Sequence, residues 1–287
     1  MTGMTKNILV TGADGFLGKK LVSQLKTGGH NVIGLSIEDF DICSPEIKRI
    51  GPLDHVFHLA GLTFVPRSWE IPGEYYRVNT LGTENVLELC KEQDCSLTFT
   101  STYMYGHPEY IPIDEKHPVG VISPYHHSKY LAEQLCEFFN KNFGVDITVF
   151  RPFNIYGEGQ AESFLIPKII DQLLDDNKKE ITLMSLSSKR DYVFIDDVID
   201  ALVISLDKTK GYEIFNLASG ESKNVQEILD ILMSVSGIKK EVISEEIDRK
   251  NEITNICGSS EKAKTFLGWT PKTELTEGLS RTIGIVL

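Results

Sequence analysis

A tyrosine and a lysine lie four residues apart in the segment Ser-Pro-Tyr-His-His-Ser-Lys, residues 123–129. Ser123 followed by Pro124 is typical of a helix N-terminus, with the serine as cap and the proline as first helical residue. Tyr125 and Lys129 are then expected on one face of that helix. A phenol has a pKa of about 10, and a neighbouring ammonium favours the phenolate. The pair is therefore a candidate for proton transfer; the alternative is a surface tyrosine above a solvated lysine.

A serine hydroxyl is predicted near that pair. Ser101 ends the predicted strand Leu97–Ser101, and open α/β sheets place ligands at the carboxyl ends of their strands. It precedes Tyr125 by 24 residues, enough for a loop that brings both over one crevice. A hydroxyl there can hydrogen-bond the reacting oxygen beside the phenol. We predict that Ser101, Tyr125 and Lys129 form a catalytic set.

Upstream, a glycine loop joins the first predicted strand, Asn7–Thr11, to the first predicted helix, Phe16–Thr27. The loop reads Thr-Gly-Ala-Asp-Gly-Phe-Leu-Gly over residues 11–18, with the spacing GxxGxxG. Glycines permit a tight turn and a close approach to a pyrophosphate, whose charge the helix N-terminus favours. The alternative is a plain strand-to-helix turn. The predicted dinucleotide contacts in this loop are Gly12, Gly15, Phe16, Leu17 and Gly18.

The cofactor is predicted to be NAD or NADP, with a weak preference for NADP. Ser36, directly after the strand Asn31–Leu35, would not repel a 2′-phosphate, although no arginine follows to attract one. Asp41 and Ile42 lie where a third strand should end, near the adenine; a turn aspartate is the alternative. Leu59, Ala60 and Gly61 end the next strand, His55–Ala60, and suit a backbone that passes close to a cofactor.

The order of elements predicts an α/β fold, a Rossmann-type doubly wound parallel sheet with a smaller C-terminal substrate lobe. Short apolar strands alternate with helices as far as the strand Ile147–Arg151, and the rhythm then loosens. We predict a dinucleotide-binding domain over 1–151 plus roughly 191–219, and a substrate lobe over 152–190 and 220–287. The remaining predicted helices are Tyr76–Glu92, Tyr125–Asn142, Phe164–Asp175, Val198–Leu206 and Val225–Ser236, and the remaining strands are Ile181–Met184 and Ile214–Leu217.

Charge and composition exclude several classes of protein. The 287 residues contain 29 Lys and Arg against 41 Asp and Glu, a net charge of −12, which disfavours nucleic-acid binding. No segment has the length of a membrane span, and nothing near residue 1 resembles a signal peptide. Five cysteines without a CxxC pair favour reduced thiols and a cytoplasmic location. We predict no metal, since His107, His117, His126 and His127 have no accompanying ligands at metal spacing.

Several motifs together give the chain a resemblance to a known group. They are TGADGFLG (11–18), HLAG (58–61), NTLGTENVL (79–87), TSTYMYG (100–106), PYHHSK (124–129), RPFNIYGEGQ (151–160), KRDYVFIDDV (189–198) and LGWTP (267–271). Over nearly its whole length the chain resembles extended short-chain dehydrogenases/reductases of the nucleotide-sugar epimerase, dehydratase and reductase group.

The resemblance implies a nucleotide-diphosphate sugar as substrate and a role for further residues. Asn79 matches an asparagine that orders the cofactor site, and Pro152 is a further cofactor contact. Asn154 and Arg190 match positions that hold the diphosphate; for Arg190 the alternative is an ion pair with Asp191 or Asp196. The other implied substrate contacts are Thr63, Phe64, Thr102 and Arg249. The group often dimerises through a four-helix bundle, so a homodimer built from Tyr76–Glu92 and Tyr125–Asn142 is expected.

The exact reaction is the least constrained expectation. Sugar dehydratases of the group carry acidic residues directly after the catalytic serine or threonine, whereas Thr102 and Tyr103 follow Ser101 here. The segments GLTFVP and RPFNIYGEGQAESF resemble reductases of nucleotide-activated 4-keto-6-deoxy sugars. We therefore predict an NAD(P)H-dependent 4-reductase, with Tyr125 as proton donor. A nucleotide-sugar 4-epimerase is the alternative, and a non-catalytic cofactor-sensing protein is a third possibility. The sequence does not assign a role to His126 or His127.

Overall fold

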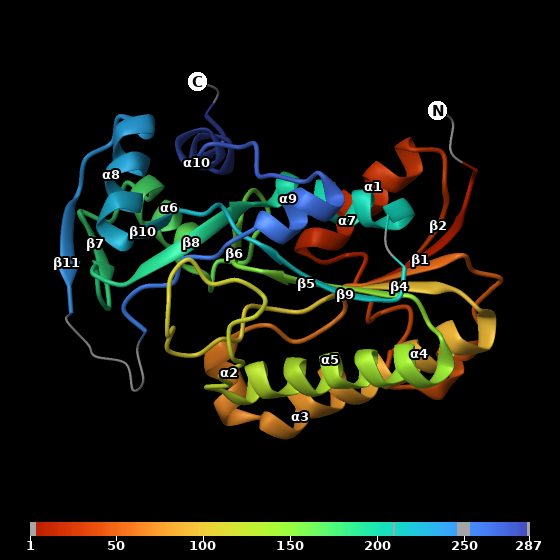
Figure 1. The fold of residues 1–287 in the computed structure, drawn as a ribbon. Coiled ribbons are helices and arrows are strands. Elements are labelled where there is room, and N and C mark those ends of the chain that lie inside the picture. The colour runs from red at the N-terminus through yellow and green to blue at the C-terminus, as the bar shows by residue number, and fades with distance from the viewer. Residues whose placement is uncertain (1–3, 209, 246–252, 286–287) are drawn as a thin grey trace.

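A six-stranded parallel sheet forms the centre of the molecule (Figure 1). The computed structural model describes residues 4–208, 210–245 and 253–285. The strand order is β2-β1-β3-β4-β5-β9, and each neighbouring pair is parallel. This order confirms the predicted doubly wound sheet. The strands are β1 (Asn7–Thr11), β2 (Asn31–Leu35), β3 (His55–His58), β4 (Ser96–Thr100), β5 (Ile147–Pro152) and β9 (Tyr212–Leu217).

Helices cover both faces of this sheet (Figure 1). One face carries α1 (Phe16–Thr27), α7 (Ile195–Lys208) and α9 (Glu261–Leu267). The other carries α4 (Gly82–Gln93) and α5 (Pro124–Phe143), with the short α2 (Val65–Glu70) and α3 (Pro72–Tyr76) at one end. A single π-helical turn, Arg77–Leu81, joins α3 to α4, so the predicted helix Tyr76–Glu92 is a composite. None of the helices in the described ranges has the length and apolarity to cross a membrane.

A smaller assembly of strands and helices adjoins the carboxyl end of β5 (Figure 1). It has a three-stranded sheet, ordered β10-β8-β6, and a parallel pair formed by β11 and β7. Residues 191–194 belong to β8 in this second sheet, whereas β9 returns to the first and pairs with β5. The elements are β6 (Asn154–Tyr156), α6 (Leu165–Leu174), β7 (Glu180–Leu183), β8 (Lys189–Phe194), β10 (Ser222–Asn224), α8 (Val225–Ser236), β11 (Glu241–Ser244) and α10 (Leu275–Ile283).

One apolar core joins the two assemblies. Ile8 and Val10 of β1, Val198 of α7 and Leu232 of α8 belong to the same buried cluster. Trp269 is 1% exposed within it, and its indole N–H donates to the Asp197 carbonyl at 2.8 Å. Close-packed cores resist small displacements, so this shared core fixes the two assemblies relative to one another.

The predicted third strand ending at Asp41 and Ile42 is wrong. Residues 37–44 form turns, and a 3₁₀ helix, Pro45–Arg49, follows them. The cause is local side-chain bonding: Ser36 donates its N–H and its hydroxyl to the Asp39 carboxylate, and Cys43 donates its N–H to Asp41. Such bonds offer the backbone an alternative to a sheet. The strand predicted as His55–Ala60 also ends earlier, at His58.

Candidate active site

The glycine loop is closed so tightly that side chains would not fit. Gly12 has φ +69°, and a Cβ there would lie 2.9 Å from the amide nitrogen of Ala60. A Cβ on Gly18 would lie 2.0 Å from the Gly12 carbonyl oxygen. The Gly15 N–H donates to that same oxygen at 3.0 Å. Glycine is therefore required at Gly12 by conformation and at Gly18 by space.

The helix that follows the loop begins without a compensating negative charge. Gly15 is the N-cap of α1, no side chain caps the first turn, and that turn, which includes Phe16, Leu17 and Gly18, holds no acidic residue. Free N–H groups and the helix dipole at such an end attract an anion. The loop and helix thus fit the pyrophosphate of a dinucleotide.

Acidic side chains gather where the adenosine end of that dinucleotide is expected. The Asp39 carboxylate accepts the Ser36 hydroxyl at 2.7 Å, which lowers the pKa of Asp39. Asp41 accepts Arg77 Nη1 at 3.0 Å, and Glu74 also engages that guanidinium. Ile42 is buried and faces Gly82. Arg77 is therefore occupied by carboxylates.

The backbone after β3 is held by Thr11 and Asn79. Leu59 and Ala60 donate their N–H groups to Thr11, and Gly61 has no room for a side chain because its Cβ would lie 2.9 Å from Asn79 Oδ1. Asn79 is 1% exposed; its Oδ1 accepts the Leu62 N–H, and its Nδ2 donates to the Leu62 carbonyl and to Ser128 Oγ. It thus fastens the β3 loop to helix α5.

Lys129 and Tyr125 converge on the carboxyl end of β4. Lys129 Nζ donates to the Thr100 carbonyl at 2.9 Å and lies 4.7 Å from the centroid of the Phe99 ring. Burial lowers the pKa of Lys129 to about 8. Burial also raises the pKa of Tyr125 to about 12, against a smaller lowering by the Thr102 hydroxyl. Burial therefore has the largest effect on the pKa of the phenol.

Two hydroxyls at this end of β4 lack a partner. Ser101 Oγ and Thr100 Oγ1 are buried and form no hydrogen bond within the described part of the chain. An unsatisfied buried hydroxyl is costly, so these atoms fit a ligand that supplies the missing partners. Pro152, at the adjoining end of β5, is buried, and its carbonyl accepts the Tyr103 N–H at 3.3 Å.

The candidate diphosphate residues lie close together. Asn154 Nδ2 donates to the Asp191 carbonyl at 2.9 Å. Arg190 Nη1 donates to the carbonyls of Lys189 and Ile253, both at 2.8 Å. In the described ranges no carboxylate pairs with Arg190, so the alternative of an ion pair with Asp191 or Asp196 is not observed. Its charge remains available to an anionic ligand.

Thr63 and Phe64 are exposed after β3, and the Phe64 ring meets Phe164 edge-on at 6.2 Å. Tyr75 donates its hydroxyl to the Phe64 carbonyl at 2.6 Å. Phe64 thus touches the second assembly. Arg249 lies outside the described residues.

Sequence reasoning missed the part played by Tyr103. Its hydroxyl donates to Asn154 Oδ1 at 3.3 Å, and its ring stacks on Phe153. The only signal was its place two residues after Ser101. It also missed a buried ion pair of Arg151 with Glu133, at 2.6 Å, one turn after Lys129 on α5.

The histidines are held by ordinary protein partners. His117 and His126 are buried, and His126 Nδ1 lies 2.7 Å from Ser123 Oγ. His127 Nδ1 lies 3.1 Å from the Tyr76 hydroxyl, and His107 is exposed. Within the described ranges no three His, Cys, Asp or Glu residues gather in a metal-binding arrangement.

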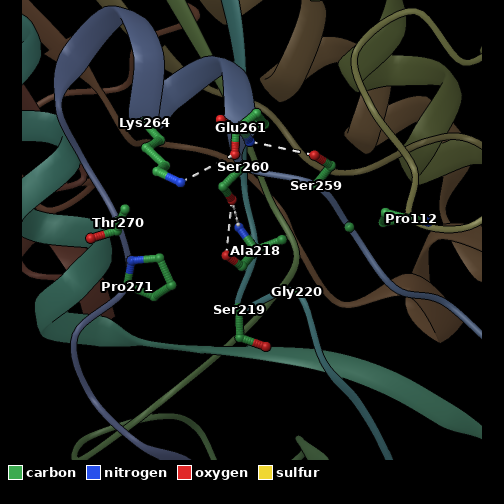
Figure 2. Close-up of a pocket in the computed structure, with 11 residues that line it drawn as sticks. Pro112, Ala218, Ser219, Gly220, Ser259, Ser260, Glu261, Lys264, Thr270 and Pro271 are labelled. Atoms are coloured by element: carbon green, nitrogen blue, oxygen red, sulfur yellow. Dashed lines mark hydrogen bonds and ion pairs between the residues drawn. The ribbon is translucent and has the colours of Figure 1, made fainter.

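A separate hollow of about 260 Å³ lies beside the start of α9 (Figure 2). Ser260 spans it, with its hydroxyl bonded to both backbone groups of Ala218, and Thr270 and Pro271 form one wall. None of the candidate catalytic, cofactor or substrate residues lines it. The candidate active site is instead the cluster of Ser101, Tyr125 and Lys129 at the carboxyl end of β4, with Asn154 at the start of β6.

Known proteins resemble the chain over nearly its whole length. A putative UDP-glucose 4-epimerase of Methanocaldococcus jannaschii is 32% identical, over 96% of this chain and 97% of that protein. A GDP-6-deoxy-D-mannose reductase of Pseudomonas aeruginosa is 30% identical, over 96% and 95%. The structure of a Thermotoga maritima UDP-glucose 4-epimerase with UDP-glucose superposes with a TM-score of 0.89 at 29% identity, covering 97% of each chain.

These similarities agree with the geometry of the candidate active site. The family model for the NAD dependent epimerase/dehydratase family matches residues 8–218, which include the glycine loop, Ser101, Tyr125, Lys129 and Asn154. The expectation of an enzyme is thereby confirmed. The chain belongs to the NAD dependent epimerase/dehydratase family.

Proposed function

We propose that this enzyme is an NAD-dependent 4-epimerase of a nucleotide-activated hexose. The observation that carries the proposal is the buried, unpartnered Ser101 hydroxyl, whose chain neighbours Thr100 and Thr102 bond Lys129 and Tyr125. The glycine loop in the same sheet fits a dinucleotide. Proteins named as 4-epimerases include the M. jannaschii relative and the T. maritima structure, and both match over nearly full length. This evidence favours the epimerase over the 4-reductase expected from the sequence.

In the proposed mechanism the chain's own residues handle one proton. Tyr125 exchanges that proton with the oxygen at C4 of the sugar, and the Ser101 hydroxyl hydrogen-bonds the same oxygen. Lys129, one turn after Tyr125 on α5, is held at the end of β4 by the Thr100 carbonyl. A bound nicotinamide supplies the complementary chemistry, accepting and returning a hydride. Turning the 4-keto sugar between the two transfers makes the result an epimerisation.

The second candidate is the 4-reductase of a nucleotide-activated 4-keto-6-deoxy sugar. The P. aeruginosa GDP-6-deoxy-D-mannose reductase favours it, at similar identity and coverage. The residues Thr102 and Tyr103 after Ser101 are compatible with both reactions, because neither is the carboxylic acid that an elimination of water needs.

Adding a nucleotide sugar without free cofactor distinguishes the 4-epimerase from the 4-reductase. Purified protein is incubated with UDP-glucose, and the products are analysed by anion-exchange chromatography and NMR. We expect the 4-epimer to form with no net change in absorbance at about 340 nm, because a hydride taken and returned leaves the nicotinamide unchanged. Stoichiometric consumption of NADH or NADPH by a 4-keto sugar, without interconversion of 4-epimers, would instead establish the reductase.

We propose NAD rather than NADP as the cofactor. Ser36 alone suggested NADP, but its hydroxyl and N–H are bonded to the Asp39 carboxylate, and Arg77 is engaged by Asp41 and Glu74. A carboxylate at this place repels a 2′-phosphate and can accept a 2′-hydroxyl. We expect NADH to bind at least about tenfold more tightly than NADPH in fluorescence titrations, and Asp39→Asn to narrow that ratio. Equal affinities in the unaltered protein would contradict the proposal.

The proposed division of labour follows the two assemblies only in part, because residues 191–194 pair in the second sheet and α9 covers the first (Figure 1). We propose that residues 1–151 with roughly 191–219 bind the dinucleotide and that 152–190 and 220–287 bind the nucleotide sugar. Dinucleotide contacts would come from Gly12, Gly15, Phe16, Leu17, Gly18, Ser36, Asp41, Ile42, Leu59, Ala60, Gly61, Asn79, Tyr125, Lys129 and Pro152. Sugar-nucleotide contacts would come from Thr63, Phe64, Ser101, Thr102, Tyr125, Asn154, Arg190 and Arg249.

We also propose that the protein forms a homodimer and that it is located in a cytoplasm. The faces of α4 and α5 that point away from the sheet, with the π turn before α4, expose Leu81 (46%), Phe138 (53%) and Phe143 (45%), which a second copy would cover. All five cysteines are free thiols, as a reducing compartment keeps them. Light scattering should give twice the 32.2 kDa mass of the chain; a monomer mass would contradict the dimer.

A further inference from the structure

The segment after Ser101 continues beside β5 toward the second assembly. Ser101 donates its N–H to the Phe150 carbonyl at 2.8 Å, and Tyr103 donates its N–H to the Pro152 carbonyl at 3.3 Å. The chain therefore runs past the carboxyl end of the sheet in step with β5. Tyr103 is carried from the catalytic serine toward Asn154, which begins β6.

The Tyr103 ring is fixed, and its hydroxyl lies beside Asn154, a candidate diphosphate residue. Phe153 stacks on one side, with ring centroids 4.9 Å apart and planes at 13°. The hydroxyl donates to Asn154 Oδ1 at 3.3 Å. Burial raises the pKa of Tyr103, against a lowering by the charge of Arg190 and by Asn154. A phenol in this state keeps its proton at neutral pH and acts as a donor.

The length of a nucleotide sugar places its hexose near Tyr103. In the proposed function the reacting carbon lies at Tyr125, and the diphosphate lies at Asn154 and Arg190. The hexose between them must pass Tyr103, whose hydroxyl bonds Asn154 and whose neighbour in the chain, Thr102, bonds Tyr125. Its bond of 3.3 Å is longer than the 2.5–3.0 Å usual for a hydroxyl donor, so a sugar hydroxyl can replace it at small cost.

We propose that Tyr103 is a further substrate-binding residue, whose hydroxyl hydrogen-bonds the hexose between Tyr125 and the Asn154–Arg190 pair. This inference rests on the proposed function, since it assumes that a nucleotide sugar spans those residues. It assigns Tyr103 to the sugar and leaves the nucleotide and diphosphate to other side chains. Loss of the Tyr103 hydroxyl should then weaken binding of the nucleotide sugar and spare binding of the free nucleotide.

The test compares Tyr103→Phe with the unaltered protein by calorimetry, using UDP-glucose against UDP and GDP-mannose against GDP. The matched control is Tyr110→Phe, since Tyr110 is an exposed phenol bonded to Asp114. For the pair that the unaltered protein binds, we expect Tyr103→Phe to lower the affinity for the nucleotide sugar about tenfold, because one hydrogen bond is lost. The affinity for the free nucleotide should fall by less than about twofold. KM for the sugar should rise by a similar factor.

The outcomes separate this inference from the proposed function. An unchanged affinity for the nucleotide sugar would overturn the role of Tyr103 and leave the proposed function standing. An equal loss for sugar and free nucleotide would also overturn it, because Tyr103 would then act through Asn154 on the diphosphate alone. If the unaltered protein bound neither nucleotide sugar, both the proposed function and this inference would fail.

Discussion

At the scale of single residues, burial decides the acidity of the proposed catalytic pair. Both side chains are nearly inaccessible: Tyr125 is 7% exposed and Lys129 is 3% exposed. Burial penalises the charged form of each, so the pKa of the phenol is raised to about 12 and that of the ammonium is lowered to about 8. The positive charge of an oxidised nicotinamide would act in the opposite direction on Tyr125. In the proposed mechanism, proton exchange would thereby be linked to cofactor binding.

Removing the Tyr125 hydroxyl should abolish turnover without unfolding the protein. Tyr125→Phe keeps the ring and its edge-on contact with Tyr75, but it removes the group that exchanges the proton. We expect kcat for epimerisation to fall about 10²–10⁴-fold, the usual contribution of a positioned acid or base. Stopped assays measure kcat, and thermal unfolding checks the fold. Tyr130→Phe, on the same helix, is the control; turnover retained in Tyr125→Phe would remove the phenol from the mechanism.

At the scale of elements, sequence pattern predicted those that repeat a regular period. α1, β1, β2 and α8 have the predicted bounds, because apolar periodicity and glycine or asparagine ends mark them locally. The three-residue strands β6 and β10 went unpredicted, since each is defined by pairing with β8 across many intervening residues. The placement of Tyr125 and Lys129 on one helical face could be predicted, because it depends only on the local sequence of α5. The bond from Lys129 to the Thr100 carbonyl could not be predicted, because it depends on where β4 ends in space.

The join between α5 and β5 depends on a buried ion pair. Glu133 of α5 and Arg151 of β5 are 3% and 5% exposed, and Arg151 also donates to the Tyr105 hydroxyl at 3.1 Å. Glu133→Gln leaves the guanidinium without its charged partner, so we expect the free energy of unfolding to fall by about 3–5 kcal/mol in urea titrations. The exposed Glu137→Gln, on the same helix, should change it by less than about 0.5 kcal/mol.

Replacing both partners tests whether charge or shape holds this join. Glu133→Leu with Arg151→Met removes both buried charges, and we expect it to recover much of the stability lost in Glu133→Gln. A double variant as unstable as the single one would show that the geometry of the pair, rather than the unpaired charge, is what the fold needs.

At the scale of the whole molecule, three of the buried histidines have strongly lowered pKa values. Burial lowers the pKa of His55 and His58 to about 3 and that of His126 to about 4. Each ring is bonded to hydroxyls: His58, for instance, lies 2.7 Å from Thr11 Oγ1 and 3.0 Å from Thr83 Oγ1, tying β1 to α4 through β3. These bonds need no charge on the ring, so the core is compatible with neutral histidines alone.

Mild acid should therefore destabilise the protein steeply. Between the unfolded pKa of about 6.5 and the folded values of about 3 and 4, the unfolded chain binds more protons than the native one. Stability is thus fully present above pH 6.5 and is lost as the pH falls, by about 1.4 kcal/mol per pH unit for each histidine. His55→Gln should reduce the slope of the unfolding free energy against pH, between about pH 6 and pH 4.5, by the contribution of one histidine, about 1.4 kcal/mol per pH unit. Urea titration at each pH measures this slope. An unaltered slope in His55→Gln would mean that His55 already carries a proton in the folded protein.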